Sequence, residues 1–314
     1  MRLPLIVEEI VEETCSAIPL SSLIKHFQSY SQAYREGKES KRSLPSELGK
    51  ICYLATRLPA TFAAVSTVLR ELKRKMGATT SLLDLGAGPG TTLISAIAEG
   101  YQLDAATLIE ENKEFITMGR RWTPSFTHWR HGDLLKQEAF PSAELVTFAY
   151  SLGEIPEGKR KNLLKTAWGA CQKALIIIEP GTPRAFKSVL DAREVLVELG
   201  GYVVAPCPHN GACPMQKNDW CHFSVRFERT SLHRRIKGAE LGYEDEKFCY
   251  VIVAKHPFPS VSRVIKTPQK NSGHVVIKLC TEHGITDKLV SKKNGELFKK
   301  AKKIEWGEAY CLEE

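Results

Sequence analysis

The sequence predicts an α/β fold built on a parallel sheet whose strands alternate with helices, with a helical region before it and a small basic unit after it. Three observations lead to this prediction. From Thr79 onward, short apolar segments alternate with helical ones. The first apolar segment runs directly into a glycine-rich turn at residues 86–90. Positive charge is concentrated near the end of the chain, whereas the rest of the chain is close to neutral.

Residues 1–77 are predicted to form a helical N-terminal region. Residues 3–17 and 46–76 carry apolar side chains at three- and four-residue spacing, and Gly77 is a helix stop signal. Between these two helices, the stretch REGKESKR at 35–42 predicts a charged loop.

Glutamates crowd the start of the chain, at positions 8, 9, 12 and 13. A secretory signal begins with basic residues and an organelle presequence avoids acidic ones, so this segment fits neither. No apolar run approaches the roughly 20 residues that span a bilayer. The sequence therefore predicts a cytoplasmic protein that does not contact a membrane.

Residues 78–256 are predicted to form the sheet domain. The expected strands are 81–85, 105–109, 127–130, 145–150 and 174–178, followed by a last, continuously apolar strand at 247–254. The expected helices are 91–99, 111–121, 158–173 and 182–199. A cysteine-rich insertion at about 205–223 interrupts this pattern. Residues 257–314 are predicted to form a basic C-terminal unit with a strand at 274–279.

A glycine-rich turn follows the first strand in SLLDLGAGPGTT, residues 81–92. Asp84 lies near the end of the strand. Gly86, Gly88 and Gly90 then let the backbone turn tightly and approach a ligand at the carboxyl edge of the sheet. This D-L-G-x-G-x-G pattern resembles the S-adenosylmethionine-binding loop of class I (Rossmann-like) methyltransferases. A dinucleotide-binding dehydrogenase domain is the alternative, because Gly-x-Gly also occurs there.

Three later residues extend the predicted S-adenosylmethionine site. Glu110 follows the second strand, where its carboxylate can accept hydrogen bonds from both ribose hydroxyls. Asp133 follows the third strand and is expected beside the adenine amino group. Tyr150 ends the fourth strand, below the expected position of the sulfonium. The spacing of Asp84 and Glu110 favours the methyltransferase over the dehydrogenase.

The methyl-acceptor side lacks a recognised catalytic pattern. Enzymes that methylate exocyclic base amines usually carry an Asn/Asp-Pro-Pro-Tyr run after the fourth strand, but residues 151–156 read Ser-Leu-Gly-Glu-Ile-Pro. Glu154 is the candidate here, either as a base or orienting acceptor or as a cap of the following helix. The catalytic residues are therefore unknown at this stage.

Three cysteines fall together in APCPHNGACPMQKNDWCHF, namely Cys207, Cys213 and Cys221. Thiols in a polar, proline-rich loop seldom serve packing, so a metal is expected. The candidates for a fourth ligand are His209, His222, Cys249 and Cys280. Soft thiolates select zinc or an iron–sulfur cluster. Structural zinc usually uses two tight C-x2–4-C pairs, which this loop lacks, so the spacing leans towards iron–sulfur without deciding.

Residues 263–303 contain eleven Lys or Arg and three Asp or Glu, a net charge of +8 that equals the net charge of the whole chain. A basic segment on a neutral body indicates an acidic polymer as partner, with RNA favoured over a membrane. A solvated lysine face is the alternative interpretation.

The order of several longer segments gives a more specific resemblance. EPGTP at 179–183, APCPH at 205–209, DWCHF at 219–223, YEDEKFCYV at 243–251 and WGEAY at 306–310 follow one another. Together with the glycine-rich loop, they resemble the ribosomal small-subunit methyltransferase-like family, which has a mitochondrial member and bacterial relatives. The resemblance covers approximately residues 46–310.

This resemblance implies a methyltransferase-type fold that binds S-adenosylmethionine and acts on the small ribosomal subunit and its rRNA during assembly or translation. It also implies a 4Fe-4S cluster, and the ligands carried over would be Cys207, Cys213, Cys221 and Cys280. Off the ribosome the protein is expected to be a monomer. The alternatives are a catalytically active rRNA methyltransferase and a zinc-stapled RNA-binding protein of the same fold. A radical S-adenosylmethionine enzyme would need a compact C-x3-C-x2-C loop, which this spacing does not match.

Overall fold

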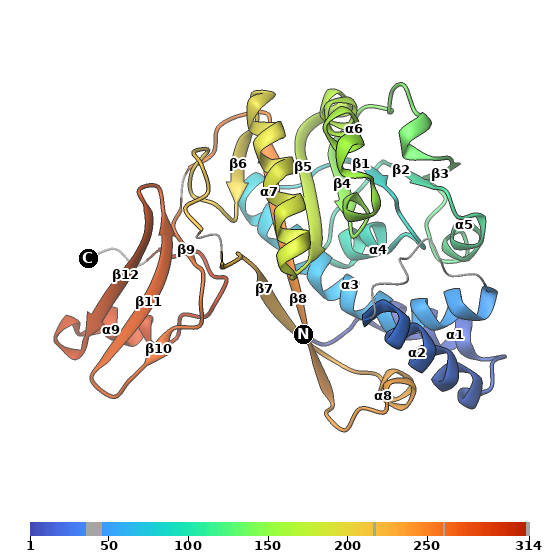
Figure 1. Ribbon diagram of the computed structural model, residues 1–314, viewed down its shortest axis with the longest axis horizontal. Coiled ribbons are helices and arrows are strands. Elements are labelled where there is room, and N and C mark those ends of the chain that lie inside the picture. The colour runs from blue at the N-terminus through green and yellow to red at the C-terminus, as the bar shows by residue number, and fades with distance from the viewer. Residues whose placement is uncertain (36–45, 216–217, 260, 312–314) are drawn as a thin grey trace.

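A computed structural model describes residues 1–35, 46–215, 218–259 and 261–311 of the chain (Figure 1). The strands of its larger sheet are β1 (Ser81–Leu85), β2 (Ala105–Glu110), β3 (Thr127–His131), β4 (Ala143–Ala149), β5 (Cys171–Pro180), β6 (Tyr202–Ala205), β7 (Phe223–Glu228) and β8 (Tyr243–Ala254). The helices around this sheet are α1 (Leu5–Cys15), α2 (Leu20–Arg35), α3 (Glu47–Met76), α4 (Thr91–Ala98), α5 (Lys113–Gly119), α6 (Glu157–Ala170), α7 (Pro183–Glu198) and α8 (Ser231–Lys237). Two short 3-10 turns, η2 (Leu134–Lys136) and η3 (Leu152–Glu154), follow β3 and β4.

The strands of the larger sheet lie in the order β3–β2–β1–β4–β5–β8–β6, and β7 also pairs with β8. β1 pairs in parallel with β2 and β4, and the parallel pairing continues outward to β3 and β5. Strand β8 runs antiparallel to β5, β6 and β7. This parallel, helix-connected sheet with an antiparallel strand near one edge confirms the predicted class I methyltransferase fold.

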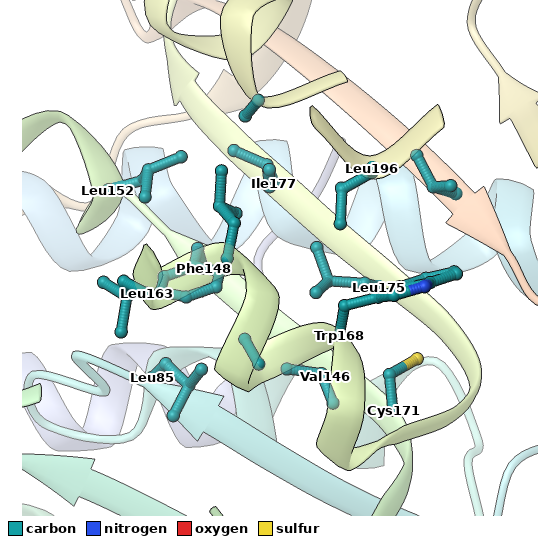
Figure 2. Close-up of a cluster of buried hydrophobic side chains, with 14 of the residues drawn as sticks. Leu85, Val146, Phe148, Leu152, Leu163, Trp168, Cys171, Leu175, Ile177 and Leu196 are labelled. Atoms are coloured by element: carbon teal, nitrogen blue, oxygen red, sulfur yellow. The ribbon is translucent and has the colours of Figure 1, made fainter. Parts of the chain in front are cut away.

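Two hydrophobic clusters cover the two faces of the sheet, because neighbouring residues of a strand point to opposite sides. On one face Val146 and Ile177 pack with Trp168 of α6, and Figure 2 shows this cluster. On the other face their chain neighbours Leu145 and Ile176 pack with residues of α3 and α4. Strands that are buried on both faces read as continuous apolar runs, which is why the sequence predicted them.

Helix α3 is the central support of the N-terminal region. Ser46 caps it by accepting a hydrogen bond from the Gly49 N–H at 3.0 Å, and Gly77 ends it with φ +74°. The sequence suggested no run of membrane-spanning length, yet α3 is long and apolar enough by that test. Its most apolar stretch is 78% buried inside the fold. The apolar character of α3 is therefore explained by its packing against the sheet, α1 and α2.

Several elements differ from the sequence-based expectations, and two of these differences have a clear physical reason. Helix α2 was not predicted, because its apolar residues are few, yet Leu23 is buried against the other N-terminal helices. Helix α6 ends three residues before the expected position because Cys171 already pairs with Ala143 of β4. Of the charged loop expected at 35–42, Arg35 ends α2, and the remaining residues lie outside the described part of the chain.

The cysteine-rich segment lies between two strands on the same side of β8. β6 pairs with β8 as far as Ala205, which is opposite Ile252. β7 begins at Phe223, opposite Phe248. The described residues between these strands form a loop beside the middle of β8. The loop therefore lies at the edge on which a second sheet packs (Figure 1).

A second sheet lies next to this edge (Figure 1). It consists of β9 (Arg263–Val264), β10 (Gln269–Lys270), β11 (His274–Thr281) and β12 (Gly284–Ser291), followed by η4 (Lys292–Asn294) and α9 (Glu296–Ala301). The strand order is β10–β11–β12, and β9 also pairs with β11. A separate hydrophobic cluster that includes Val275, Ile277 and Phe298 fills one face of this sheet.

The chain after α9 fixes the second sheet against the first. Gly307 donates to the carbonyl of Val264 at 2.9 Å. Its φ is +91°, and a Cβ at this position would lie 3.1 Å from the Phe223 ring, so a glycine suits this close approach. The neighbouring Trp306 meets the His222 ring edge-on, with centroids 4.9 Å apart. The second sheet is thereby docked on the cysteine-rich loop.

Candidate functional site

A cavity of about 360 Å³ lies at the carboxyl ends of β1, β2 and β3. It falls in the size range of small-molecule sites, which measure roughly 300–1,000 Å³. Of the residues predicted to bind S-adenosylmethionine, Gly86, Glu110 and Asp133 line it. Glu154 also lines it. The crevice beyond the carboxyl ends of parallel strands is where α/β folds usually bind ligands.

The glycine-rich turn is shaped by backbone contacts. Gly86 has φ +77°, and a Cβ there would lie only 2.6 Å from the Cβ of Ser151. The Ser151 hydroxyl in turn donates to the Leu85 carbonyl at 2.6 Å. The N–H groups of Gly86 and Ala87 both donate to the Ile109 carbonyl, at 2.9 and 3.0 Å. A side chain at position 86 would therefore push the turn away from β4 and alter the cavity wall.

Glu110 holds the turn and lines the cavity at the same time. Its Oε2 accepts from the Gly88 N–H at 2.8 Å, and its Oε1 accepts from the Asn112 N–H at 2.9 Å. Each carboxylate oxygen has two lone pairs, so each can accept a further hydrogen bond from a ligand hydroxyl. Gly88 thus contributes to the site through Glu110.

Three other predicted residues support the turn. Asp84 is buried, and its Oδ1 accepts from the Thr147 hydroxyl at 2.7 Å, which joins β1 to β4. Gly90 has φ +88° and stands at the N-cap of α4. Asp133 caps η2 by accepting from the Leu135 N–H at 2.9 Å. Among these three, the cavity wall includes only Asp133.

Tyr150 points away from this cavity. Its φ is +57°, a rare value for a residue other than glycine. Its hydroxyl donates to Glu246 at 3.0 Å, and Arg57 donates to the same carboxylate at 2.8 and 3.2 Å. Burial and then the Glu246 charge raise the pKa of Tyr150 well above its ordinary value. Burial lowers the pKa of Arg57, but Glu246 outweighs that effect and raises it.

The position of Glu154 bears on its two predicted roles. It ends η3, whereas α6 begins at Glu157 after Pro156 at the N-cap. Glu154 therefore lies before the N-cap of α6 and not at it, and it lines the cavity. The neighbouring Gly153 N–H donates to Glu179 at 2.9 Å, which anchors this turn to β5.

A second cavity, of about 40 Å³, is lined by all four cysteines of the implied ligand set. Cys207, Cys213 and Cys221 come from the loop between β6 and β7, and Cys280 comes from β11 of the second sheet. Apolar residues of α7, β8 and the second sheet form most of the remaining wall. This space is far smaller than the roughly 300–1,000 Å³ of organic-cofactor sites.

Burial dominates the acidity of these thiols. It raises the pKa of Cys207, raises that of Cys221 well above its ordinary value, and raises that of Cys280 to about 12. Neighbouring thiols of the set also raise all three pKa values, because negative charges in one cavity repel each other. Four thiolates would be stable here only if a bound metal group or nearby cations balanced their charge.

Arg193 of α7 supplies one such cation. It is buried, and its Nη2 donates to the carbonyls of His209 and Gly211 at 2.7 and 2.8 Å. Its charge lowers the pKa of Cys207 against the larger effect of burial. Arg193 therefore both holds the loop and favours a thiolate in the cavity.

Arg263 of β9 supplies a second buried cation near the thiols. It donates to the carbonyls of Pro206 and Gly307 at 3.2 and 2.8 Å, and it forms a buried ion pair with Glu71 of α3. The other oxygen of Glu71 accepts from the Tyr250 hydroxyl at 2.5 Å. This network joins the N-terminal helices, the cysteine loop and the second sheet.

The remaining candidate ligands are placed differently. Cys249 also lines the cavity, but its thiol donates to the Pro180 carbonyl at 3.3 Å. His209 lies with its Nε2 3.9 Å from the Cys280 sulfur. His222 stacks on Trp220, with centroids 5.1 Å apart.

No group of three or more His, Cys, Asp or Glu side chains in the described residues is arranged to hold a metal ion. A structural zinc ion needs four ligands that converge on one point, with sulfurs at about 2.3 Å. The described residues therefore contain no assembled metal site, and the iron–sulfur and zinc expectations stay predictions.

Four lysines of the basic segment at 263–303 lie at one end of the second sheet. Lys292, Lys293, Lys299 and Lys300 are exposed on η4 and α9. Lys299 pairs with Glu296 at 2.6 Å. This group presents positive charge to solvent, whereas the charge of Arg263 is buried.

Sequence reasoning missed the residues that join the sites to the rest of the fold. Arg57 and Arg263 pair with carboxylates far away in the chain, and the buried Arg193 holds the cysteine-rich loop through the carbonyl of His209. A signal existed for Arg57, because it interrupts the apolar stretch of a predicted buried helix. No comparable signal identified Glu246 or Glu71.

Comparisons with known proteins agree with the resemblance. Residues 47–311 match the family model Rsm22, described as mitochondrial small ribosomal subunit Rsm22. The human ribosome assembly protein METTL17, mitochondrial, is 26% identical over 289 residues, which cover 82% of this chain and 61% of the human protein. Rsm22-cox11 tandem protein 2, mitochondrial, of Schizosaccharomyces pombe is 23% identical over 324 residues, which cover 84% of this chain and 43% of the yeast protein. The chain thus spans less than two thirds of the length of either relative.

Solved methyltransferase structures are more distantly similar. An O-methyltransferase family protein from Burkholderia thailandensis aligns with a TM-score of 0.46 and 13% identity, over 78% of this chain and 73% of that one. Magnesium protoporphyrin IX methyltransferase from Synechocystis aligns with a TM-score of 0.40 and 9% identity, over 76% of this chain and 97% of that one.

The expected cytoplasmic location is corrected by these comparisons. The family model and both relatives are described as mitochondrial. The expectation rested on the acidic residues near the N-terminus. These residues belong to α1, whose Val7, Ile10 and Val11 are buried in the fold. Their acidity therefore reflects the solvent face of a helix and carries no information about targeting.

Proposed function

The chain belongs to the mitochondrial small ribosomal subunit Rsm22 family, and from this membership we propose that it binds S-adenosylmethionine and an iron–sulfur cluster and acts on the small ribosomal subunit and its rRNA. The human relative is named a ribosome assembly protein, which supports assembly as the stage of action. The proposal gives each part of the chain one task. Residues 1–77 cover the sheet, the methyltransferase-like domain at 78–256 binds the cofactor, and the basic unit at 257–314 contacts RNA.

One observation carries the proposal. Four cysteines from two separate segments line a single buried cavity between the larger sheet and the basic unit. Cys207, Cys213, Cys221 and Cys280 are the thiolates that a 4Fe-4S cluster requires. Zinc is the alternative metal, but the loop lacks the two tight C-x2–4-C pairs that structural zinc usually uses. A cluster bound in this cavity would link the cysteine-rich loop to β11.

The cofactor assignment is supported by the cavity at the strand ends. It is large enough for a nucleoside ligand, and Glu110 keeps lone pairs directed to further donors. Gly86 of the glycine-rich turn also lines it. These features fit S-adenosylmethionine or its demethylated product.

The function is tested in cells that lack the chain. Their small-subunit sedimentation profile should show a deficit, and the wild-type chain should restore it. Cys249→Ser should also restore it, whereas Cys280→Ser should not, although both remove one thiol from the same cavity. Crosslinking should recover small-subunit rRNA with the wild-type chain. A normal profile in deleted cells, or full rescue by Cys280→Ser, would contradict the proposal.

An active rRNA methyltransferase is the second candidate, because Glu154 lines the cofactor cavity and could orient an acceptor. Against it, the space under the glycine-rich turn measures only about 20 Å³, and it is lined by Arg57 and Tyr150, which both donate to Glu246. A methylation map of small-subunit rRNA separates the two candidates. A mark that disappears with Glu154→Gln while assembly continues would favour the enzyme.

A further inference from the structure

The free edge of the larger sheet carries a groove that the proposed function has not used. Strand β3 ends the strand order and therefore has a neighbour on one side only. A groove of about 780 Å³ lies along this edge, and Arg120, His128 and Arg130 line it. Arg120 comes from the end of α5, whereas the other two project from β3 itself.

The groove is cationic and not neutralised locally. All three basic side chains are exposed, and the residues that line the groove include no carboxylate. Within the described part of the chain, neither the Arg120 nor the Arg130 guanidinium has an ion-pair or hydrogen-bond partner. By contrast, the adjacent Arg121 pairs with Glu13 of α1. The whole stretch 115–132 contains three Arg and two His but no Asp or Glu.

The other lining groups select the kind of anion. Thr107 and Ser125 add hydroxyls to the wall of the groove, whereas the Thr123 hydroxyl already donates to the Gly119 carbonyl. Guanidinium forks and hydroxyls together match phosphate oxygens and sugar hydroxyls.

The one indole in the groove is not placed for base stacking. Trp129 donates through Nε1 to Thr123 at 3.1 Å, and its ring packs so closely on Gly90 and Gly119 that a Cβ on Gly119 would lie 2.4 Å from it. The groove therefore offers contacts to a sugar–phosphate backbone, and its indole ring is not available for stacking on a base.

We infer that this β3-edge groove is a second contact surface for the RNA backbone, an inference that rests on the proposed function. The lysines of η4 and α9 and the β3 edge lie near opposite ends of the molecule (Figure 1). A chain with cationic surfaces at both ends can hold two RNA segments at once. Binding at the β3 edge is independent of RNA sequence, because it uses phosphate contacts.

The salt dependence of RNA binding tests the inference. The double variant Arg120→Gln, Arg130→Gln should bind a small-subunit rRNA fragment about tenfold more weakly at moderate salt. The slope of log K against log salt should fall by about two, one for each lost phosphate contact. The matched control is Lys165→Gln, Arg184→Gln, which removes two exposed positive charges elsewhere and should leave the slope unchanged. Equal thermal midpoints would show that both variants are folded.

A bridging measurement separates the two ends. Two short RNA duplexes labelled with donor and acceptor dyes should show energy transfer with the wild-type chain. Transfer should be lost both in the β3-edge double variant and in a chain with Lys292, Lys293, Lys299 and Lys300 replaced by Gln, while each variant still binds one duplex. RNA binding with an unchanged slope in the double variant would overturn this inference alone. A wild-type chain that binds no RNA would overturn the proposed function and this inference together.

Discussion

The two cavities of this chain are built in different ways. The cavity beside Gly86 and Glu110 is formed by successive strand ends of one parallel sheet, and backbone hydrogen bonds shape it. The cysteine cavity is formed by α7, the loop after β6, β8 and the second sheet. Buried arginines hold its walls. The first cavity therefore depends on local sequence, whereas the second depends on how two sheets are fixed to each other.

This difference predicts how damage spreads. A change in the first cavity should weaken its ligand and leave the rest of the fold intact. A change at the second should also release the second sheet, because Cys280 and Arg263 pair directly across β11 and β9. Variants in each region test this distinction.

The largest effect is expected for Arg263→Met. Removing one partner of a buried ion pair leaves the other charge unbalanced and costs about 3–5 kcal/mol. Here the change leaves Glu71 buried and also removes hydrogen bonds to Pro206 and Gly307. Urea unfolding should show this loss, and amide exchange should show early opening of the second sheet.

A matched control for Arg263 is available on β7. Arg226 also pairs with a carboxylate, that of Asp245 at 2.8 Å, but both side chains are exposed. Arg226→Met should leave the unfolding midpoint close to that of the wild type. Equal effects of the two substitutions would contradict the idea that the junction between the sheets depends on a buried network.

The next largest effect concerns the first cavity. Glu110→Ala should weaken S-adenosylmethionine binding by about 1–3 kcal/mol, because a charged acceptor is lost and the Gly88 N–H loses its partner. Calorimetry measures this change directly. Glu138→Ala removes an exposed carboxylate outside the cavity and serves as the control. Unchanged affinity in Glu110→Ala would remove this residue from the site, and a loss of iron in it would break the distinction between the two cavities.

The cavity beside Gly86 and Glu110 could be predicted from the sequence, whereas the cysteine cavity could be predicted only in part. The turn at 86–90 and the carboxylate at Glu110 follow adjacent strands, so their spacing alone placed them together. The cysteine loop gave three thiols, but the position of Cys280 came from the resemblance, because its pairing with Arg263 depends on tertiary structure. Tyr150 was predicted in the cofactor site, yet its hydroxyl turns to Glu246, whose strand lies far along the chain.

Short strands were missed for a similar reason. The segment YVVA of β6 is too brief to register as a strand, and the proline after it ends the pattern. Its pairing with β8 gives it a defined place that local propensity does not. Arg57 and Glu246 are likewise brought together by packing of α3 on the sheet.

A smaller effect is expected from the lysines of η4 and α9. Replacing Lys292, Lys293, Lys299 and Lys300 by Gln should weaken RNA binding about tenfold at moderate salt. Lys299 is already paired with Glu296, so the salt slope should fall by about three rather than four. Iron content and cofactor affinity should not change. An unchanged slope would mean that these lysines form an ordinary solvent-exposed surface and do not contact RNA.

The smallest effect is a pH dependence outside both cavities. Burial lowers the pKa of His233 to about 3, from an ordinary value near 6.5. Between these values the unfolded chain binds the proton and the folded chain does not, so stability falls as the pH drops below 6.5. One such group should cost about 1 kcal/mol between pH 7 and pH 5.5.

The variant His233→Phe should reduce this pH dependence, because it keeps a ring stacked on Phe227 without a titrating group. Unfolding free energies at pH 7 and pH 5.5 measure the difference between the variant and the wild type. An identical pH dependence in both would show that other groups account for the acid sensitivity.

The iron content of protein purified without oxygen tests most directly whether the cysteine cavity joins the two sheets through a cluster. The wild-type chain should contain about four irons and about four acid-labile sulfides. Cys280→Ser should lose them and expose the second sheet to amide exchange, whereas Cys249→Ser, whose thiol donates to the Pro180 carbonyl, should keep them. One zinc per chain in the anaerobic wild type, or full iron in Cys280→Ser, would contradict the account.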